Sequence, residues 1–307
     1  MQTLETLKRS IKSADDLAGV VRTMKTMAAV SIRQYETATE SLDVYSRTID
    51  TGLGMVLRRL SDVGRNNVAC DDTGTEKQKS TSGLTGAIIF GSDQGMCGQF
   101  NEQIAQFAVD SLSEKAGGRQ QIAPVLCVGH RVSDAVSSAG MHAKHIFRLP
   151  GSASGITSLV QDLLPAIDQW REAHNIVRIL VFHNRRLSAS TWRPYAMQLL
   201  PLQPERFKHD HEEDSQPASR SLAMWTMDTR VLFSRLVKQF LFVSLFRACA
   251  ESLAGENASR IAAMQAAERN IKDRLQLLRS DYANRRQTTI TEELLDVVTG
   301  FEALQQN

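Results

Sequence analysis

Proline is confined to the middle of this chain of 307 residues, where all seven prolines lie between positions 124 and 217. Because proline lacks a backbone N–H and its ring clashes with the preceding helical turn, it breaks or kinks a helix from within. The two proline-free ends can therefore each form a long uninterrupted helix. The chain is expected to fold as helix, middle domain, helix.

The N-terminal end carries one apolar stripe at helical spacing. From Thr3 to Leu60 apolar residues recur at steps of three and four with few slips, which predicts an amphipathic helix. At 1.5 Å per residue this helix would be a rod of roughly 85 Å, and a rod of that length needs a partner. The stripe comprises Leu4, Leu7, Ile11, Ala14, Leu17, Val21, Met24, Ala28, Ile32, Tyr35, Leu42, Ile49, Val56 and Leu60.

The C-terminal end supplies that partner. Residues 222–304 contain no proline and repeat apolar side chains at near-helical intervals, so a second long helix is expected. Two long terminal helices suggest an antiparallel coiled coil. The second stripe comprises Val231, Leu236, Phe240, Leu245, Leu253, Ile261, Met264, Ile271, Leu275, Leu278, Tyr282, Ile290, Leu294 and Val298.

The middle of the chain alternates short apolar runs with helical stretches. Strands are expected at 87–90, 125–128, 143–147, 179–182 and 191–200, and helices at 102–114, 131–139 and 156–173. Pro165 is expected to kink or restart the last helix. This alternation predicts a largely parallel sheet. The fold class is therefore α/β: a central Rossmann-like α/β domain plus a long antiparallel coiled coil of the terminal helices.

Composition divides the chain into five parts. Residues 1–69 and 222–307 form the two coiled-coil helices, and residues 84–204 form the central α/β domain. The polar segments 70–83 and 205–221 are expected to be solvated, flexible linkers.

The glycine-rich run Gly91–Gly98 follows a predicted strand and precedes a predicted helix, as a phosphate-binding loop would. It contains Ser92, Asp93, Gly95 and Gly98, but Gln99 stands where a P-loop needs lysine. The run also departs from the dinucleotide pattern G-x-G-x-x-G. We interpret it as a tight turn that presents Ser92 and Asp93 to a partner, and no bound cofactor is expected.

No catalytic or metal-binding constellation emerges. The segment Gly151–Gly155 has Ala153 where a nucleophile elbow needs serine. His142 and His145 fall on opposite faces of a predicted strand, which excludes a shared metal ion. His209 and His211 lie among acidic residues that are better explained as a flexible loop.

Charge and cysteine content exclude several classes. With 36 Lys+Arg and 34 Asp+Glu the net charge is only +2, too small for nucleic-acid binding by overall charge. No apolar stretch reaches the roughly 18 residues of a membrane span, and the acidic residues near the start lead us to expect no secretory or transit signal there. The four widely spaced cysteines indicate free thiols.

Between Leu17 and Tyr35 the only charged residues are Arg22, Lys25 and Arg33. This basic stretch suits either an acidic partner surface or a face exposed to solvent.

Three separated motifs resemble one known family. They are the segment Val21–Ala29 (VRTMKTMAA), the run Ser92–Gly98 (SDQGMCG) with Asn101, and the segment Tyr282–Leu294 (YANRRQTTITEEL). Together with the order helix, sheet, helix, they resemble the γ subunit of F-type ATP synthases over nearly the whole chain. Glu256, Arg260, Met264 and the pair Ala266–Ala267 agree in order and spacing.

The resemblance implies a non-catalytic rotary stalk. The paired helices would fill the ring of α and β subunits, and the sheet domain would lie against the ε subunit and the c-ring. Met24 and Lys25 would then face an acidic region of a β subunit. Hydrogen bonds to loops of the ring would come from Arg286, Gln287, Thr291 and Glu293. The location implied is peripheral, at the cytoplasmic face of the cell inner membrane.

Departures from the family pattern define the alternatives. Lys25 stands where many members carry an acid, and Ile271-Lys272 replaces a Gly-Gly pair. These differences suggest a divergent, alternate branch of the ATPase, such as the sodium-translocating kind. The linker at 70–83 has one cysteine, so thiol switching is not expected. Two other readings stay open: a free-standing coiled-coil adaptor with an α/β module, and an α/β enzyme that uses the Gly91–Gly98 loop.

Overall fold

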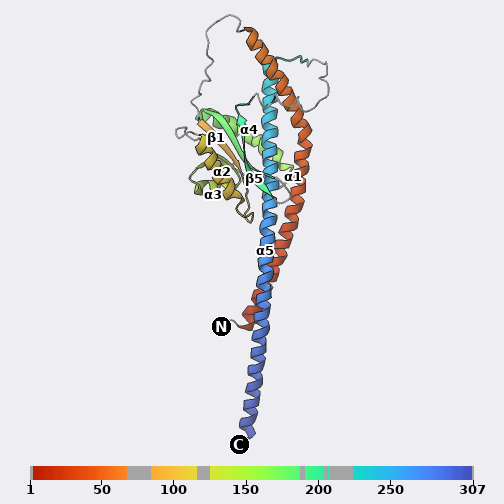
Figure 1. The fold of residues 1–307 in the computed structure, drawn as a ribbon, viewed down its shortest axis with the longest axis vertical. Coiled ribbons are helices and arrows are strands. Elements are labelled where there is room, and N and C mark those ends of the chain that lie inside the picture. The colour runs from red at the N-terminus through yellow and green to blue at the C-terminus, as the bar shows by residue number, and fades with distance from the viewer. Residues whose placement is uncertain are drawn as a thin grey trace. The chain divides into compact units, whose positions relative to one another are not determined.

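The computed structural model describes residues 3–67, 84–115, 125–186, 191–203, 207 and 224–305, and Figure 1 draws the chain as a ribbon. The predicted linkers at 70–83 and 205–221, apart from Phe207, lie outside the described residues. Cys70 and the acidic segment with His209 and His211 lie outside them too.

Two long helices occupy the ends of the chain, α1 (Leu4–Asn67) and α5 (Thr229–Gln305). Each begins at a capping side chain that accepts an otherwise unpaired backbone N–H. Thr3 Oγ1 accepts from the N–H of Thr6 at 3.3 Å. Asp228 Oδ1 accepts from the N–H groups of Arg230 and Val231 at 2.8 and 3.2 Å. The second helix therefore starts at Thr229, seven residues later than expected.

Internal contacts group the chain into two compact units. The helical unit combines Met1–Ala29 with Arg260–Asn307, and the sheet unit is Val30–Ser259. The boundaries between the units fall inside α1 and α5, whereas the sequence divides the chain at its polar segments. The five-part division therefore stays a prediction.

The two helices run antiparallel in each unit. In the helical unit Lys25 pairs with Glu268 and Asp15 with Arg279, so a backward step along α1 accompanies a forward step along α5. In the sheet unit the same rule relates the pairs Asp43–Arg247 and Tyr45–Gln239. The antiparallel arrangement is that expected from the two stripes.

A five-stranded sheet forms the centre of the sheet unit. Its elements in chain order are β1 (Leu84–Phe90), α2 (Phe100–Lys115), β2 (Val125–Val128), α3 (His130–Ser138), β3 (Ala143–Phe147), α4 (Gly155–His174), β4 (Ile176–Arg186) and β5 (Trp192–Leu200). The strand order is β3-β2-β1-β4-β5. All pairs are parallel except β4–β5, which is antiparallel. The predicted α/β fold class is confirmed.

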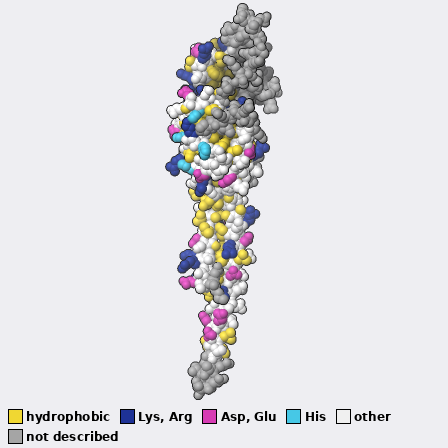
Figure 2. Space-filling model, turned by 90° about the vertical axis from the view of Figure 1, so that its left-hand side faces the viewer, with side chains coloured by type: hydrophobic (Ala, Val, Ile, Leu, Met, Phe, Trp, Pro, Cys, Tyr) yellow, Lys and Arg dark blue, Asp and Glu magenta, His cyan; other side chains and the backbone are white. Residues whose placement is uncertain are grey.

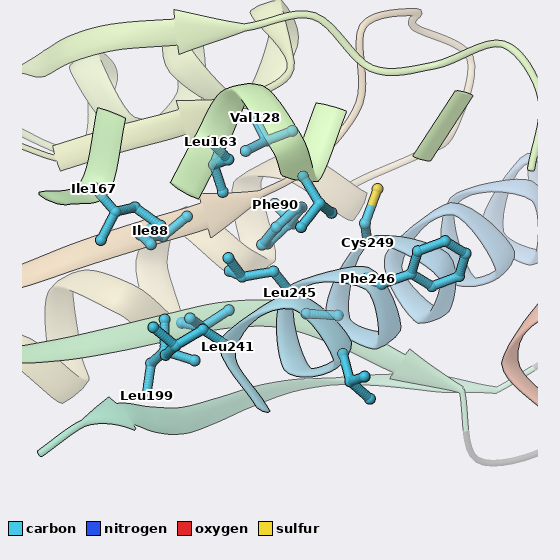
Figure 3. Packing of buried hydrophobic residues seen from close by; sticks show 14 of the residues in the cluster. Ile88, Phe90, Val128, Leu163, Ile167, Leu199, Leu241, Leu245, Phe246 and Cys249 are labelled. Atoms are coloured by element: carbon cyan, nitrogen blue, oxygen red, sulfur yellow. The ribbon is translucent and has the colours of Figure 1, made fainter. Parts of the chain in front are cut away.

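The alternation of side chains along the strands gives the sheet two apolar faces. One face packs against α2 and α3 and includes Ala87, Ile89, Val125, Cys127, Leu180 and Phe182. The other packs against α4, α5 and α1 and includes Ile88, Phe90, Leu126, Val128, Ile179 and Val181. Figure 3 shows Leu163 of α4 and Leu245 of α5 on this second face, on either side of Phe90.

The structure departs from the sequence expectations at two residues, Pro165 and Phe207. Helix α4 continues from Gly155 to His174 through Pro165, so the helix does not restart there. Pro165 and the residue one turn before it, Gln161, are both exposed, so water can reach the carbonyl that loses its partner. In the second polar segment Phe207 is not solvated, because it is 5% exposed and packs edge-on against Phe240 with ring centroids 5.6 Å apart.

Candidate functional site

The turn after β1 is fixed by its own side chains. The N–H of Ser92 donates to Asn101 Oδ1 at 2.9 Å, and Asn101 Nδ2 donates to Ser92 Oγ at 2.8 Å. Ser92 is 0% exposed and Asn101 is 5% exposed. Ser92 is therefore not presented to a partner, as the sequence suggested, but closes the turn onto the start of α2.

Asp93 joins three loops at the carboxyl edge of the parallel strands. Its Oδ1 accepts from the N–H of His130, after β2, and its Oδ2 accepts from the N–H of Leu149, after β3, each at 2.8 Å. Hydrogen bonds from N–H groups to a carboxylate are stronger than those between neutral groups. Both oxygens are thus used inside the sheet unit, and Asp93 positions the loop rather than offering itself to a ligand.

The tip of the same turn borders a cavity of about 480 Å³ between α2 and α3. Met96 is 64% exposed and adopts a left-handed backbone with φ 61°, as does Gly98 with φ 61°. The charged groups in the lining are Glu102, Asp134 and Arg131. Two carboxylates against one guanidinium do not make a phosphate site, so the chemistry of the lining argues against the nucleotide-binding alternative.

A second contact joins this turn to α5 within the sheet unit. Ser259 Oγ donates to the carbonyl of Cys97 at 2.5 Å, and both residues are buried. Gly98 lies beside the same serine hydroxyl. The turn that contains Ser92, Asp93, Gly95 and Gly98 therefore joins the sheet to α5.

Within the described part of the chain, no three His, Cys, Asp or Glu side chains gather in a way that could hold a metal ion. Nor does a helix there have a stretch apolar enough to cross a bilayer. On the face shown in Figure 2, acidic and basic side chains are interspersed rather than segregated. That face offers no continuous basic surface of the kind that binds nucleic acid.

Lys25 in the helical unit points toward α5. Its Nζ lies 2.6 Å from Glu268 Oε2. The hydrogen bond and charge of Lys25, with a smaller contribution from Arg22, lower the pKa of the Glu268 carboxyl. Met24 is half-buried and lines a shallow groove with Asp15, Asp16, Gly19, Val20 and Thr23. The two neighbours expected to face an acidic partner thus have different environments.

The other expected contact residues, Arg286, Gln287, Thr291 and Glu293, are all exposed on α5. Thr291 Oγ1 donates to the carbonyl of Gln287 at 2.9 Å, within the helix. Before Thr291 and after Glu293 on the same helix lies an apolar set that sequence reasoning only partly identified. Its members are Ile290, Leu294, Leu295, Val297 and Val298, with exposures of 49, 60, 56, 70 and 43%; we call these five residues the apolar end of α5.

Comparisons with known proteins cover the whole chain. Residues 3–304 match the ATP-synt family, described as ATP synthase. The ATP synthase gamma chain of Rhizobium etli is 26% identical over 309 residues, which is 99% of this chain and 100% of that protein. The gamma chain of Nitrosomonas eutropha is 23% identical over 304 residues, again 99% of this chain and 100% of that protein.

Solved structures with the same fold include chains of mitochondrial ATP synthases. A chain of the Euglena gracilis enzyme, in the part described as OSCP/F1/c-ring, has a TM-score of 0.66 at 17% identity and covers 98% of this chain and 94% of its own. A chain from the central stalk/c-ring of the Tetrahymena thermophila enzyme has a TM-score of 0.52 at 16% identity, covering 81% of this chain and 99% of its own. At this level of identity the likeness is one of fold.

Proposed function

The chain belongs to the ATP-synt family and is a rotor γ subunit of an F-type ATP synthase, and from this premise we propose which of its residues contact the α/β ring. The subunit is non-catalytic: it transmits torque between the membrane c-ring and the nucleotide sites of the ring. Its partners are the α and β subunits, the ε subunit and the c-ring, and it is part of a peripheral, membrane-associated complex.

The apolar end of α5 carries the proposal. Large apolar side chains that stay exposed in a row mark a surface that a partner covers. Arg286, Gln287, Thr291 and Glu293 precede most of these side chains on the same helix and supply hydrogen-bonding groups on one side of them. An apolar centre with a polar rim is typical of protein interfaces. We therefore assign this segment to the contact with the ring.

A second contact is assigned to the outer face of α1. Leu17, Val20 and Met27 are 56, 55 and 65% exposed, and Met24 falls at the same helical spacing between them. These four residues, which we call the outer stripe, present a second apolar row on the helix. Met24 keeps the role that the resemblance implies, whereas Lys25 acts mainly through Glu268.

A non-catalytic shaft can drive chemistry through differential binding. As it turns, each of three equivalent β subunits meets a different face of the shaft and is stabilised in a different conformation. The outer stripe on α1 and the apolar end of α5 give the shaft one such contact surface on each helix. For location, we propose the cytoplasmic face of the cell inner membrane, reached through the c-ring.

The test is to assemble the complex around a tagged form of this chain and to measure which subunits co-purify and how fast ion-driven ATP synthesis runs. A chain that ends at Tyr282 should lose most of the coupled rate. Alanine at Arg286, Gln287, Thr291 and Glu293 together should reduce it. Normal synthesis in both variants would contradict the assignment of these contacts.

A matched control uses Arg235→Ala with Lys238→Ala. Both side chains are exposed on α5 near its start, far along the helix from the proposed contact. This variant should assemble and synthesise ATP at the unaltered rate. Recovery of the tagged wild-type chain without α and β subunits would contradict the rotor function itself.

A further inference from the structure

The seam of α1 in the helical unit follows a strict heptad. Apart from Met24, its buried or half-buried positions recur at alternating steps of three and four, as in a coiled coil whose helices contact along one line. Leu17 lies off this line and is exposed, while its neighbour Ala18 is half-buried. The α1 seam consists of Leu4, Leu7, Ile11, Ala14, Ala18, Val21, Lys25 and Ala28. Lys25 is its only charged member.

The facing seam of α5 has the same form. From Met264 to Tyr282 the α5 seam consists of Met264, Glu268, Ile271, Leu275, Leu278 and Tyr282, again at alternating steps of four and three. Glu268 is its only charged member. The single charge on each seam therefore has the opposite sign to the other, and the two side chains meet at 2.6 Å with 33 and 35% exposure.

We propose that Lys25 and Glu268 are positioning residues that set the register and rotation of the coiled coil in the helical unit. Apolar seams tolerate a slip of one heptad, since one aliphatic side chain packs in place of another. Here such a slip would place Lys25 against Leu275 in one direction, or Lys25 against Ile261 and Glu268 against Ala18 in the other. Each outcome leaves the charges of Lys25 and Glu268 unpaired at a half-buried seam, which is unfavourable.

Lys25 and Glu268, which we call the register pair, matter for function because residues of the outer stripe lie next to the α1 seam. Each residue of the outer stripe precedes a seam residue: Leu17 comes before Ala18, Val20 before Val21, Met24 before Lys25 and Met27 before Ala28. The rotation of the seam therefore decides where the outer stripe points. This consequence rests on the proposed rotor function, whereas the register itself does not.

Another ion pair of the helical unit serves as a contrast. Asp15 and Arg279 lie 3.3 Å apart, but their side chains are 49 and 62% exposed and both lie off the seams. An exposed pair of this kind contributes little, and its loss should leave the register unchanged.

Disulfide cross-linking of the full chain measures the register directly. Ala18→Cys with Leu275→Cys lies one heptad from the register pair on each helix and reports the native register. Ala18→Cys with Tyr282→Cys reports a slip of one heptad. In the wild-type background the first pair should cross-link and the second should not.

Replacing both charges tests the proposal. Lys25→Leu with Glu268→Leu makes both seams apolar, so the helical unit should stay folded while the native cross-link falls several-fold and the slipped one appears. The exchange Lys25→Glu with Glu268→Lys should restore the native cross-link, and Asp15→Asn with Arg279→Gln should keep it. A doubly apolar variant that still cross-links only in the native register would overturn the proposal.

The assembled complex separates this proposal from the rotor function. The doubly apolar variant should still co-purify with α and β subunits but synthesise ATP less efficiently for each ion-driven turnover, and the charge exchange should recover the coupling. If the wild-type chain cross-links in the native register but does not bind the ring, the result would contradict the rotor function and leave the register proposal standing. Coupling that falls equally in the doubly apolar and charge-exchanged forms would show that register is not what these residues determine.

Discussion

Gly86 on β1 packs against the indole ring of Trp170 on α4 so closely that a Cβ at position 86 would overlap the ring. Trp170 is 4% exposed and cannot turn away into solvent. Gly86→Ala should therefore destabilise the sheet unit by about 1–3 kcal/mol, the usual cost of overpacking a core. Thermal unfolding of the full chain measures the loss.

Gly151→Ala is the matched control for that substitution. A Cβ at Gly151 would meet no atom within 4 Å, so its unfolding midpoint should stay close to that of the wild type. If both glycine variants unfold alike, close packing against Trp170 is not the reason for glycine at position 86.

Asp93→Asn should loosen the carboxyl edge of the sheet. The amide keeps one oxygen acceptor, so one of the N–H groups of His130 and Leu149 loses its partner, at a cost of about 1–3 kcal/mol. Amide hydrogen exchange at these two positions should accelerate. Asp162→Asn, at an exposed position on α4, is the control and should change neither hydrogen exchange nor stability. Equal protection of the two N–H groups in both variants would contradict the bridging role of Asp93.

The helices and strands can be predicted from the sequence because the spacing of apolar residues reflects local backbone geometry. The strands at 125–128 and 143–147 were placed to the residue, and the helices of the sheet unit to within a few residues. Strand order and the antiparallel direction of β5 were out of reach, since they depend on how distant segments pair. The restart expected at Pro165 does not occur. The cost of a proline inside a helix depends on whether water reaches the carbonyl that loses its partner, and this depends on burial in the folded chain.

Side-chain roles were harder to predict than elements. Leu17 and Ala18 both satisfy the helical spacing of the α1 stripe, and the greater hydrophobicity of leucine favours Leu17. For the same reason the sequence favours Met24 over Lys25 at the next such position. A strict heptad traced from Leu7 through Val21 to Ala28 would have placed Lys25 on the seam, but its partner Glu268 lies far along the chain. Likewise Asp93 follows β1 as a ligand-binding residue would, and only the loops after β2 and β3 reveal its actual partners.

The free-standing adaptor was a reasonable alternative from the layout of helix, sheet, helix. It is set aside because the family match extends over residues 3–304, through both helices and the sheet. The assignment to a divergent or sodium-translocating branch stays a prediction.

Stability should fall at alkaline pH because of buried thiols. Burial raises the pKa of Cys127 to about 12, and burial with the nearby Glu256 carboxylate raises the pKa of Cys249 further. In the unfolded chain a thiol ionises near pH 8.5, so above that pH the unfolded state loses protons that the folded state keeps. This contribution to stability is complete below about pH 8.5 and declines by up to about 1.4 kcal/mol per pH unit for each thiol.

Denaturant unfolding at pH 8 and pH 10 measures this decline. Cys127→Ala should flatten the pH dependence while lowering stability at both values through the lost sulfur. The described cysteines are buried, so thiol reagents should label Cys127 and Cys249 only after unfolding. Rapid labelling of either in the folded chain would contradict the burial on which the pH dependence rests.

The apolar end of α5 should be dispensable for the fold and required for assembly. Leu294→Asn with Val298→Asn changes side chains that are 60 and 43% exposed, so the unfolding midpoint of the isolated chain should shift little. If the ring covers these side chains, the same variant loses apolar contact area there, and the yield of α and β subunits on the tagged chain should fall. Val231→Asn, 47% exposed near the start of α5, provides the control and should leave that yield unchanged. Equal yields from all three chains would mean that the ring does not bind the end of α5, and the contact would then have to be sought on the outer stripe of α1.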